Sequence, residues 1–275
     1  EGNAAPWTVV LPVMFHGVRK EGGEVSDNMT VTHDYFVQSM EHAKKLGFDT
    51  ITSKQLVDFL ERNAPIPERS LLLIIDDRRL GTFEQHFLPY MNEYNWTTTL
   101  AYITGVANDR EWTRIKDVLD TGHADLQAHG YLHNGQTYVT TFTPEDVILG
   151  EIKNPITAFE GHNIPRPIAF IWPGGNYNEY SVKMAQENGY KVGFTVHSRG
   201  ALMFNSIPQG EQERKIGNPF FTLPRSWSTA MYVDLDAAAA LSESAKEYAQ
   251  THRDEEIAWV QANCAAASET PIPTP

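Results

Sequence analysis

Five consecutive aliphatic residues, Leu71 to Ile75, stand directly before two aspartates, Asp76 and Asp77. An apolar run without polar alternation is typical of a strand that is buried on both faces, as in a parallel sheet covered by helices. A buried carboxylate without a partner is costly, so this pair must meet water, a cation or a proton. Because ligands of α/β folds bind at the carboxyl ends of strands, we predict a functional site here. The alternative is that one aspartate caps the next helix.

A second cluster, His129-Gly130-Tyr131-Leu132-His133, follows the short run from Ala124 to Ala128. Two histidines four residues apart share one face of a helical turn, so we expect both imidazoles to reach one metal ion. Two imidazole nitrogens and one carboxylate leave coordination positions open, as a catalytic metal site requires. Exposed helix histidines have the same spacing. Only the combination with the paired aspartates therefore predicts a metal centre.

The whole chain is large enough for one α/β domain, since it has 275 residues with 41% hydrophobic content. Its net charge of −13 argues against nucleic acid or an anionic membrane as a partner. No apolar run approaches the roughly 18 residues of a membrane span. The single Cys264 excludes an intramolecular disulfide and a cysteine-rich zinc site. The sequence does not indicate an oligomeric state.

Strand-like and helix-like segments alternate about seven times along the chain. This alternation predicts a (β/α) barrel or a wound parallel sheet. We expect strands at residues 8–15, 48–51, 71–75, 97–103, 124–128, 168–172, 190–196 and 220–223. We expect helices at residues 32–46, 53–60, 82–94, 111–120, 144–160, 180–188 and 237–262.

The two ends of the chain bear on its organisation and localisation. The chain begins at Glu1 without a methionine, which indicates either a chosen sequence boundary or a removed leader, and from a removed leader we expect a secreted, cell-surface or periplasmic protein. We predict a catalytic domain at residues 1–235, a C-terminal helix packed on or flanking it at 236–266, and a Pro/Thr-rich linker or tail at 267–275.

With both clusters in hand, the chain resembles the NodB-homology polysaccharide deacetylases, carbohydrate esterase family 4. The matching stretches are Ile74 to Asp77, His129 to His133 and Trp172 to Asn178, within a similarity that covers about residues 8 to 232. The resemblance implies a distorted, incomplete (β/α) barrel of about seven strands. A strand that ends in Phe15-His16 and the Gly47-Phe48 turn are similar to the poly-N-acetylglucosamine deacetylase branch.

The resemblance also implies roles for individual residues. Asp77, His129 and His133 would hold a divalent metal, with zinc expected and cobalt, nickel or iron as alternatives. Asp76 would be the general base, and His16 would protonate the leaving amine, with His197 as a weaker alternative. Arg225 would keep the base ionised, and the alternative is a surface ion pair.

Substrate contacts follow from the same resemblance. The backbone N–H of Gly174 would stabilise the oxyanion. Trp172 and Tyr177 would stack on sugar rings, although Trp172 is equally consistent with a core position. Tyr131 would border the groove or serve packing.

The chain departs from the family pattern at three positions. Arg78 stands where glycine usually follows the paired aspartates, Ile171 replaces an arginine, and Gly174 replaces an aromatic residue. The branch that it resembles also tends to lack that arginine.

We therefore predict a metal-dependent hydrolase that removes N-acetyl groups from a GlcNAc-containing polysaccharide and releases acetate. The alternatives are a catalytically degenerate homologue that only binds sugar, an O-acetyl (xylan-type) esterase using the same site, and a non-haem iron oxygenase.

Overall fold

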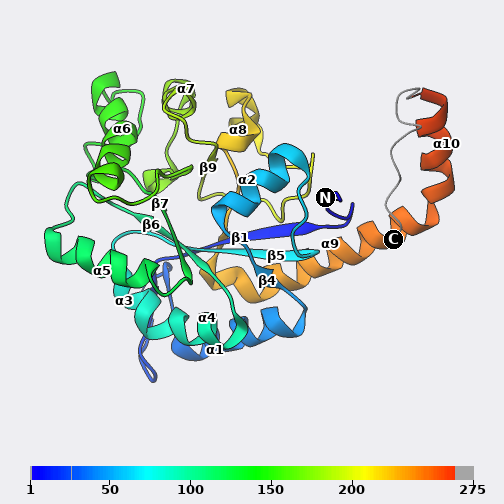
Figure 1. Ribbon diagram of the computed structural model, residues 1–275, viewed down its shortest axis with the longest axis horizontal. Coiled ribbons are helices and arrows are strands. Elements are labelled where there is room, and N and C mark those ends of the chain that lie inside the picture. The colour runs from blue at the N-terminus through cyan, green and yellow to red at the C-terminus, as the bar shows by residue number, and fades with distance from the viewer. Residues whose placement is uncertain (1, 26, 264–275) are drawn as a thin grey trace.

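The computed structural model describes residues 2–25 and 27–263 of the chain (Figure 1). Its main sheet has eight parallel strands, seven of which follow the order β10-β1-β5-β6-β7-β8-β9, while β4 pairs with β5. A separate pair joins β2 to β3. The strands are β1 (Val9–Phe15), β2 (Gly17–Val18), β3 (Thr30–Val31), β4 (Asp49–Thr50), β5 (Arg69–Ile75), β6 (Thr98–Tyr102), β7 (Ala124–Ala128), β8 (Ala169–Ile171), β9 (Val192–Phe194) and β10 (Ser226–Trp227).

Helices cover the sheet, with α6, α7 and α8 at the top of Figure 1 and α1 and α4 at the bottom. Their bounds are α1 (His33–Lys45), α2 (Ser53–Arg62), α3 (Leu80–Thr82), α4 (Leu88–Tyr94), α5 (Asp109–Leu119), α6 (Glu145–Gly161), α7 (Glu179–Glu187), α8 (Glu211–Ile216), α9 (Met231–Thr251) and α10 (Arg253–Asn263). A π-helical turn (Phe83–Phe87) joins α3 to α4, and 3₁₀ turns lie at Pro173–Gly175, Pro219–Phe221 and Ser228–Ala230. The parallel sheet and its helices form the predicted incomplete (β/α) barrel.

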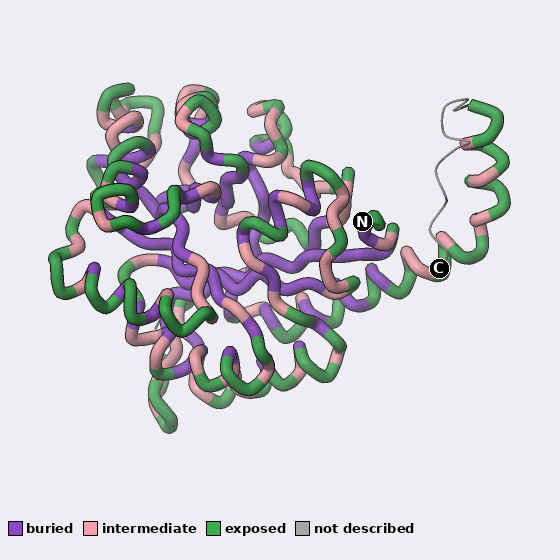
Figure 2. Tube along the Cα trace, viewed as in Figure 1, coloured by how far each residue is buried: buried purple, intermediate pink, exposed green. Residues whose placement is uncertain are grey.

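The central strands are buried on both faces, as the aliphatic run predicts (Figure 2). Alternate residues of β5 enter two separate cores, with Leu71, Leu73 and Ile75 in one and Leu72 and Ile74 in the other. The first core packs against α1, the α3–α4 segment, α5 and α9, and the second includes one face of α2. This burial fixes where β5 ends and therefore where the paired aspartates lie.

The last predicted strand is wrong. Residues 219–221 form a 3₁₀ turn, in which Pro219 lacks the N–H that a central strand needs. Leu223 makes only an isolated parallel bridge to Phe194 of β9, and β10 then pairs with β1. The segment from Leu223 to Trp227 thus contacts β9, which is one edge strand of the sheet, and then forms β10, which is the other.

Two helix predictions also need correction. The helix predicted at residues 53–60 extends to Arg62 as α2, and its N-cap is Thr52, whose hydroxyl accepts from the N–H of Gln55 in a capping box. The helix predicted at residues 237–262 is instead two helices. α9 runs from Met231 to Thr251, and α10 begins at Arg253 after His252. The predicted domain boundary between residues 235 and 236 therefore falls inside α9, whose buried residues join the first core.

The predicted tail at 267–275 and Cys264 lie outside the described residues. Among the residues described, no helix combines the length and apolar character that crossing a membrane requires.

Candidate active site

The predicted site residues follow the carboxyl ends of neighbouring strands. β1 and β5 pair in register from Val9–Arg69 to Phe15–Ile75, so His16 and Asp76 leave the sheet side by side. The N–H of Asp76 extends this ladder by donating to the carbonyl of Phe15 at 2.8 Å. His129 follows β7 in the same way and donates its N–H to the carbonyl of Tyr102.

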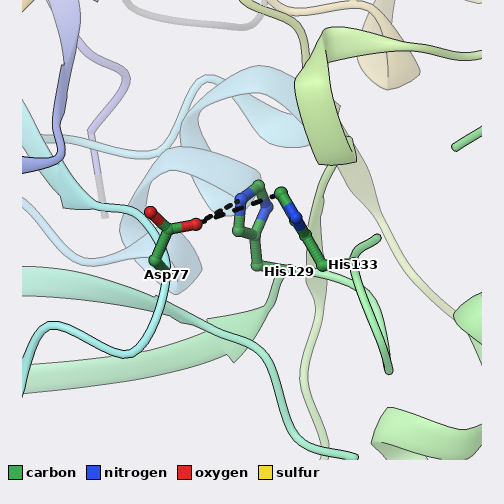
Figure 3. A group of neighbouring side chains, drawn as sticks. All are labelled: Asp77, His129 and His133. Carbon is green, nitrogen blue, oxygen red and sulfur yellow. Dashed lines mark ion pairs between the residues drawn. The ribbon is translucent and has the colours of Figure 1, made fainter. Parts of the chain in front are cut away.

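Asp77, His129 and His133 converge on one point, and Figure 3 shows the carboxylate pointing toward both imidazoles. One Asp77 oxygen, Oδ1, lies 3.7 Å from Nε2 of His129 and 3.9 Å from Nε2 of His133. One donor atom from each residue lies within 4.8 Å of the other two. Two nitrogens and one oxygen at this spacing fit a divalent metal such as zinc, with further coordination positions left for water or substrate.

Both imidazoles present Nε2 to this point and use Nδ1 elsewhere. Nδ1 of His129 lies 2.9 Å from the carbonyl of Ile171, and burial, the main cause, lowers the pKa of His129 to about 4. His129 is therefore neutral at pH 7, which is the form that binds metals. Nδ1 of His133 lies 3.4 Å from the hydroxyl of Tyr138. Such contacts orient metal-binding histidines.

The two histidines do not lie on a helical turn, so that part of the prediction is wrong. Residues 129–133 form an irregular loop in which Gly130 has φ +75° and His133 has φ +47°. The loop is shaped by the buried carboxylate of Glu151 on α6, which accepts from the N–H groups of Tyr131, Leu132 and His133. The imidazoles meet because the loop folds back, and not because of helical periodicity.

Asp76 is buried with only 1% of its surface exposed, and Arg225, equally buried, is its partner. Nη1 of Arg225 donates to Oδ1 of Asp76 at 2.7 Å, and its Nε donates to the carbonyl of Thr195 at 2.8 Å. Burial by itself raises the pKa of Asp76, but the charge of Arg225, followed by His129 and His16, brings the pKa below its ordinary value. Arg225 is not in a surface ion pair, and Asp76 does not cap a helix.

His16 lies on the other side of Asp76. Its Nε2 is 3.8 Å from Oδ2 of Asp76, which is also 3.9 Å from Nε2 of His129. Burial lowers the pKa of His16, and the charges of Asp76 and Asp77 oppose this effect. Among the described residues, His197 forms no ion pair with either aspartate.

The arginines that follow Asp77 leave the donor atoms free. Arg78, which replaces the usual glycine, turns away and pairs with Glu111 at the start of α5. Arg79 approaches from the rim, with Nε 3.5 Å from Oδ2 of Asp77, the oxygen that does not face the histidines. Asp77 itself has φ +70°, a backbone conformation that is uncommon outside glycine.

The predicted aromatic platform is not exposed, and the alternative core position of Trp172 is confirmed. Trp172 has no exposed surface, donates its indole N–H to the carbonyl of Phe221 and packs in the core between α6 and α7. Tyr177 belongs to the same buried cluster with 7% of its surface exposed, so neither ring offers a face to a sugar. The half-buried ring of Tyr131 packs close to Gly105 and lines surface pockets beside α6, and its contact with substrate stays a prediction.

Gly174 is exposed at φ +60°, with the ring of Tyr138 close to where a side chain would begin. Its predicted role as an oxyanion donor stays a prediction. Sequence reasoning missed Tyr138, Glu151 and Trp227, whose half-buried ring lies 6.3 Å from that of His16. None of these residues belongs to a motif of recognisable spacing, so their positions could be found only from the structure.

The family is defined by comparison with known sequences. The family model described as polysaccharide deacetylase matches residues 62–193, which include both aspartates and both histidines. Residues 62–193 therefore match a polysaccharide deacetylase domain, the family to which the NodB-homology resemblance also points. His16 and Arg225 lie outside the matched segment.

Individual relatives agree with this placement. The Bacillus subtilis protein YxkH, whose name places it among the polysaccharide deacetylases, is 21% identical over 195 residues. This match covers 70% of the present chain but 66% of YxkH, just under two thirds of its length.

Two solved structures show the same fold. The Streptococcus pyogenes deacetylase PplD in complex with acetate has a TM-score of 0.66 and 20% identity, over 83% of this chain and 97% of PplD. IcaB from Ammonifex degensii has a TM-score of 0.63 and 15% identity, and the match covers 87% of this chain and 98% of IcaB.

Proposed function

We propose that this protein is a metal-dependent deacetylase that hydrolyses the N-acetyl groups of a GlcNAc-containing polysaccharide and releases acetate. The observation that carries the proposal is the arrangement of two aspartates at the end of β5. Asp77 faces His129 and His133 as a ligand, while Asp76 is held ionised beside them by Arg225. A module that only bound sugar would have no need of a buried base next to metal ligands.

Different residues of the site would bind the metal, accept a proton and donate a proton. Asp77, His129 and His133 would hold a divalent metal, which would acidify water and polarise the acetamide carbonyl. Arg225 occupies Oδ1 of Asp76, which leaves Oδ2 to accept a proton from the attacking water. The water oxygen bonds to the carbonyl carbon, the carbon–nitrogen bond breaks, and protonated His16 gives its proton to the leaving amine. Acetate and a free amine are the products.

The choice of substrate rests on resemblance. His16 follows the first strand, as in the poly-N-acetylglucosamine deacetylase branch, and one structure with the same fold is named IcaB. We propose that the half-exposed ring of Trp227, near His16, takes the sugar-binding role that the buried Trp172 cannot fill. Zinc as the metal and localisation outside the cytoplasm stay predictions.

The test measures bound metal by elemental analysis and acetate release from N-acetylglucosamine oligomers. We expect the wild type to hold about one metal ion per chain and to release acetate. Asp77→Ala should lose both properties because it removes a ligand. Asp76→Asn should keep the metal but lose acetate release because the amide cannot take the proton. Asp117→Ala, on the exposed side of α5, is the matched control and should behave as the wild type.

Three results would contradict the proposal. Absence of metal from wild type that has been offered zinc, cobalt, nickel and iron would remove the metal centre. Metal without acetate from any N-acetylated glycan would favour the degenerate sugar-binding homologue. Acetate from acetylated xylan but not from N-acetylated glycans would assign the site to ester hydrolysis.

A further inference from the structure

Glu151 has no role in the proposed chemistry, yet it is buried with 5% of its surface exposed. It lies in the second turn of α6, and its carboxylate faces the loop that carries the two histidines. Oε2 accepts from the N–H groups of Tyr131 at 2.9 Å and His133 at 3.1 Å, and Oε1 accepts from that of Leu132 at 2.9 Å. Three consecutive backbone donors thus converge on one side chain.

The three backbone N–H groups provide the hydrogen bonds that the buried carboxylate of Glu151 needs. Within residues 2–25 and 27–263, Glu151 forms no ion pair with a lysine, arginine or histidine. A buried anion is stable only when its oxygens are hydrogen-bonded, and successive backbone N–H groups form an effective concave anion site. The glutamate and the loop conformation therefore depend on each other.

The loop needs this support because its backbone is unfavourable. His133 has φ +47°, which costs free energy in a residue other than glycine and persists only when its surroundings hold it. At Gly130, also at positive φ, an added Cβ would lie 2.7 Å from Oε2 of Glu151. The carboxylate therefore fits against a loop that has no side chain at this position.

We propose that Glu151 is a positioning residue for the metal ligand His133. By binding the N–H of His133 and its two predecessors, the carboxylate fixes the backbone from which the imidazole reaches Asp77. Nε2 of His133 lies 3.9 Å from Oδ1 of Asp77 in this arrangement. Glu151 touches neither the reacting atoms nor the metal donors, and it acts through His133 alone. This inference rests on the metal site of the proposed function.

The experiment compares the Co²⁺ affinity of wild type, Glu151→Gln and Glu160→Gln, measured by titration of the metal-free proteins and by the visible Co²⁺ absorption. The glutamine keeps the size of the side chain but loses the charge that strengthens the three bonds. We expect Glu151→Gln to bind Co²⁺ about 10- to 100-fold more weakly, with a changed absorption band. Glu160→Gln, in an exposed ion pair of the same helix, should match the wild type.

A double-mutant cycle tests whether the effect passes through His133. In a His133→Ala background, Glu151→Gln should weaken Co²⁺ binding no further, because the ligand that it positions is already absent. In a His129→Ala background it should still weaken binding. Equal losses in both backgrounds would indicate a general structural effect and would overturn the proposal.

The remaining outcomes are distinct. Wild-type affinity and spectrum in a folded Glu151→Gln variant would overturn the role of Glu151 while leaving the metal site intact. A wild type that binds no Co²⁺ would overturn the metal site and this inference together. If Glu151→Gln does not fold, Glu151→Asp replaces it, because aspartate keeps the charge but reaches less far. Glu151→Asp should fold and bind Co²⁺ more weakly than the wild type. An affinity equal to that of the wild type would contradict the proposal.

Discussion

At the scale of single residues, the site depends on a buried charge pair formed by residues 149 positions apart. Asp76 remains ionised without solvent because Arg225 donates directly to it, and Arg225 is held in turn by the carbonyl of Thr195. Removing one partner of such a pair leaves an uncompensated buried charge. The pair should therefore affect both stability and the state of the base.

Arg225→Met should lower the free energy of unfolding at neutral pH by about 3–5 kcal/mol. In the wild type the pKa of Asp76 is lowered, so its stabilising contribution is present above the unfolded value of 3.8 and is lost as pH falls through the folded value. Without Arg225, burial raises this pKa, so the acid limb of acetate release should move to higher pH. Urea unfolding and pH–rate profiles test both effects. An unchanged acid limb in a folded variant would contradict this account of Arg225.

His16→Gln should lower acetate release by about 10²- to 10⁴-fold, because glutamine cannot protonate the leaving amine. Metal content should not change, since His16 is not one of the three ligands. The same substitution at His42, which pairs with Asp236 between α1 and α9, is the control. Activity equal to that of the wild type in His16→Gln would assign the proton donor to another group.

At the scale of elements, the segment after the paired aspartates contains a further buried histidine, His86. The π-helical turn Phe83–Phe87 joins α3 to α4 and places His86 against His33, with their rings 5.8 Å apart. Burial, followed by the charge of His33, lowers the pKa of His86. Protonation of His86 should therefore oppose folding.

The stability of the fold should fall as pH drops below the ordinary histidine value of 6.5, because the unfolded chain then takes up a proton that folded His86 resists. His86→Leu removes this group, so its unfolding free energy should change less steeply between about pH 7 and 5. Urea unfolding across this range measures the slopes. His252→Leu, at the end of α9, is the control, and equal slopes in wild type and His86→Leu would contradict the prediction.

At the scale of the whole molecule, the two C-terminal helices differ in their relation to the core. α9 buries Met231, Leu235, Ala238 and Ala239 in the core that includes β1 and α1. α10 has no buried residue and extends away from the body (Figure 1). The hydrophobic core therefore extends through α9, whereas α10 contributes no buried residue to it.

Ending the chain after His252 should change the free energy of unfolding by less than about 1 kcal/mol and leave acetate release intact, because no core residue is removed. Ending it after Ala230 should prevent folding, since the first core then loses the buried face of α9. Thermal unfolding and acetate assays on both truncated chains test this division. A large loss of stability in the longer chain would show that α10 supports the fold.

Local patterns in the sequence were sufficient for the parallel sheet, most element positions and the aspartate and histidine clusters. A doubly buried strand needs an unbroken apolar run, and its end is where polar residues meet solvent, so both features appear in a few consecutive residues. The same reasoning failed at residues 129–133, because a loop shaped by Glu151 can bring two histidines together at a spacing that is also helical. It left Trp172 open between a sugar platform and a core position, because the exposure of a ring depends on distant elements.

The sequence by itself thus determined which residues could bind a metal and act as a base, because those capacities belong to side-chain chemistry. Only the tertiary structure decided that Arg225 reaches Asp76, that Glu151 supports the histidine loop and that Trp227 rather than Trp172 lies near His16. These contacts join segments that are far apart in the chain, and their partners are chosen by the closure of the sheet and the packing of helices upon it. No local pattern records that choice, because each side chain alone is compatible with many neighbours.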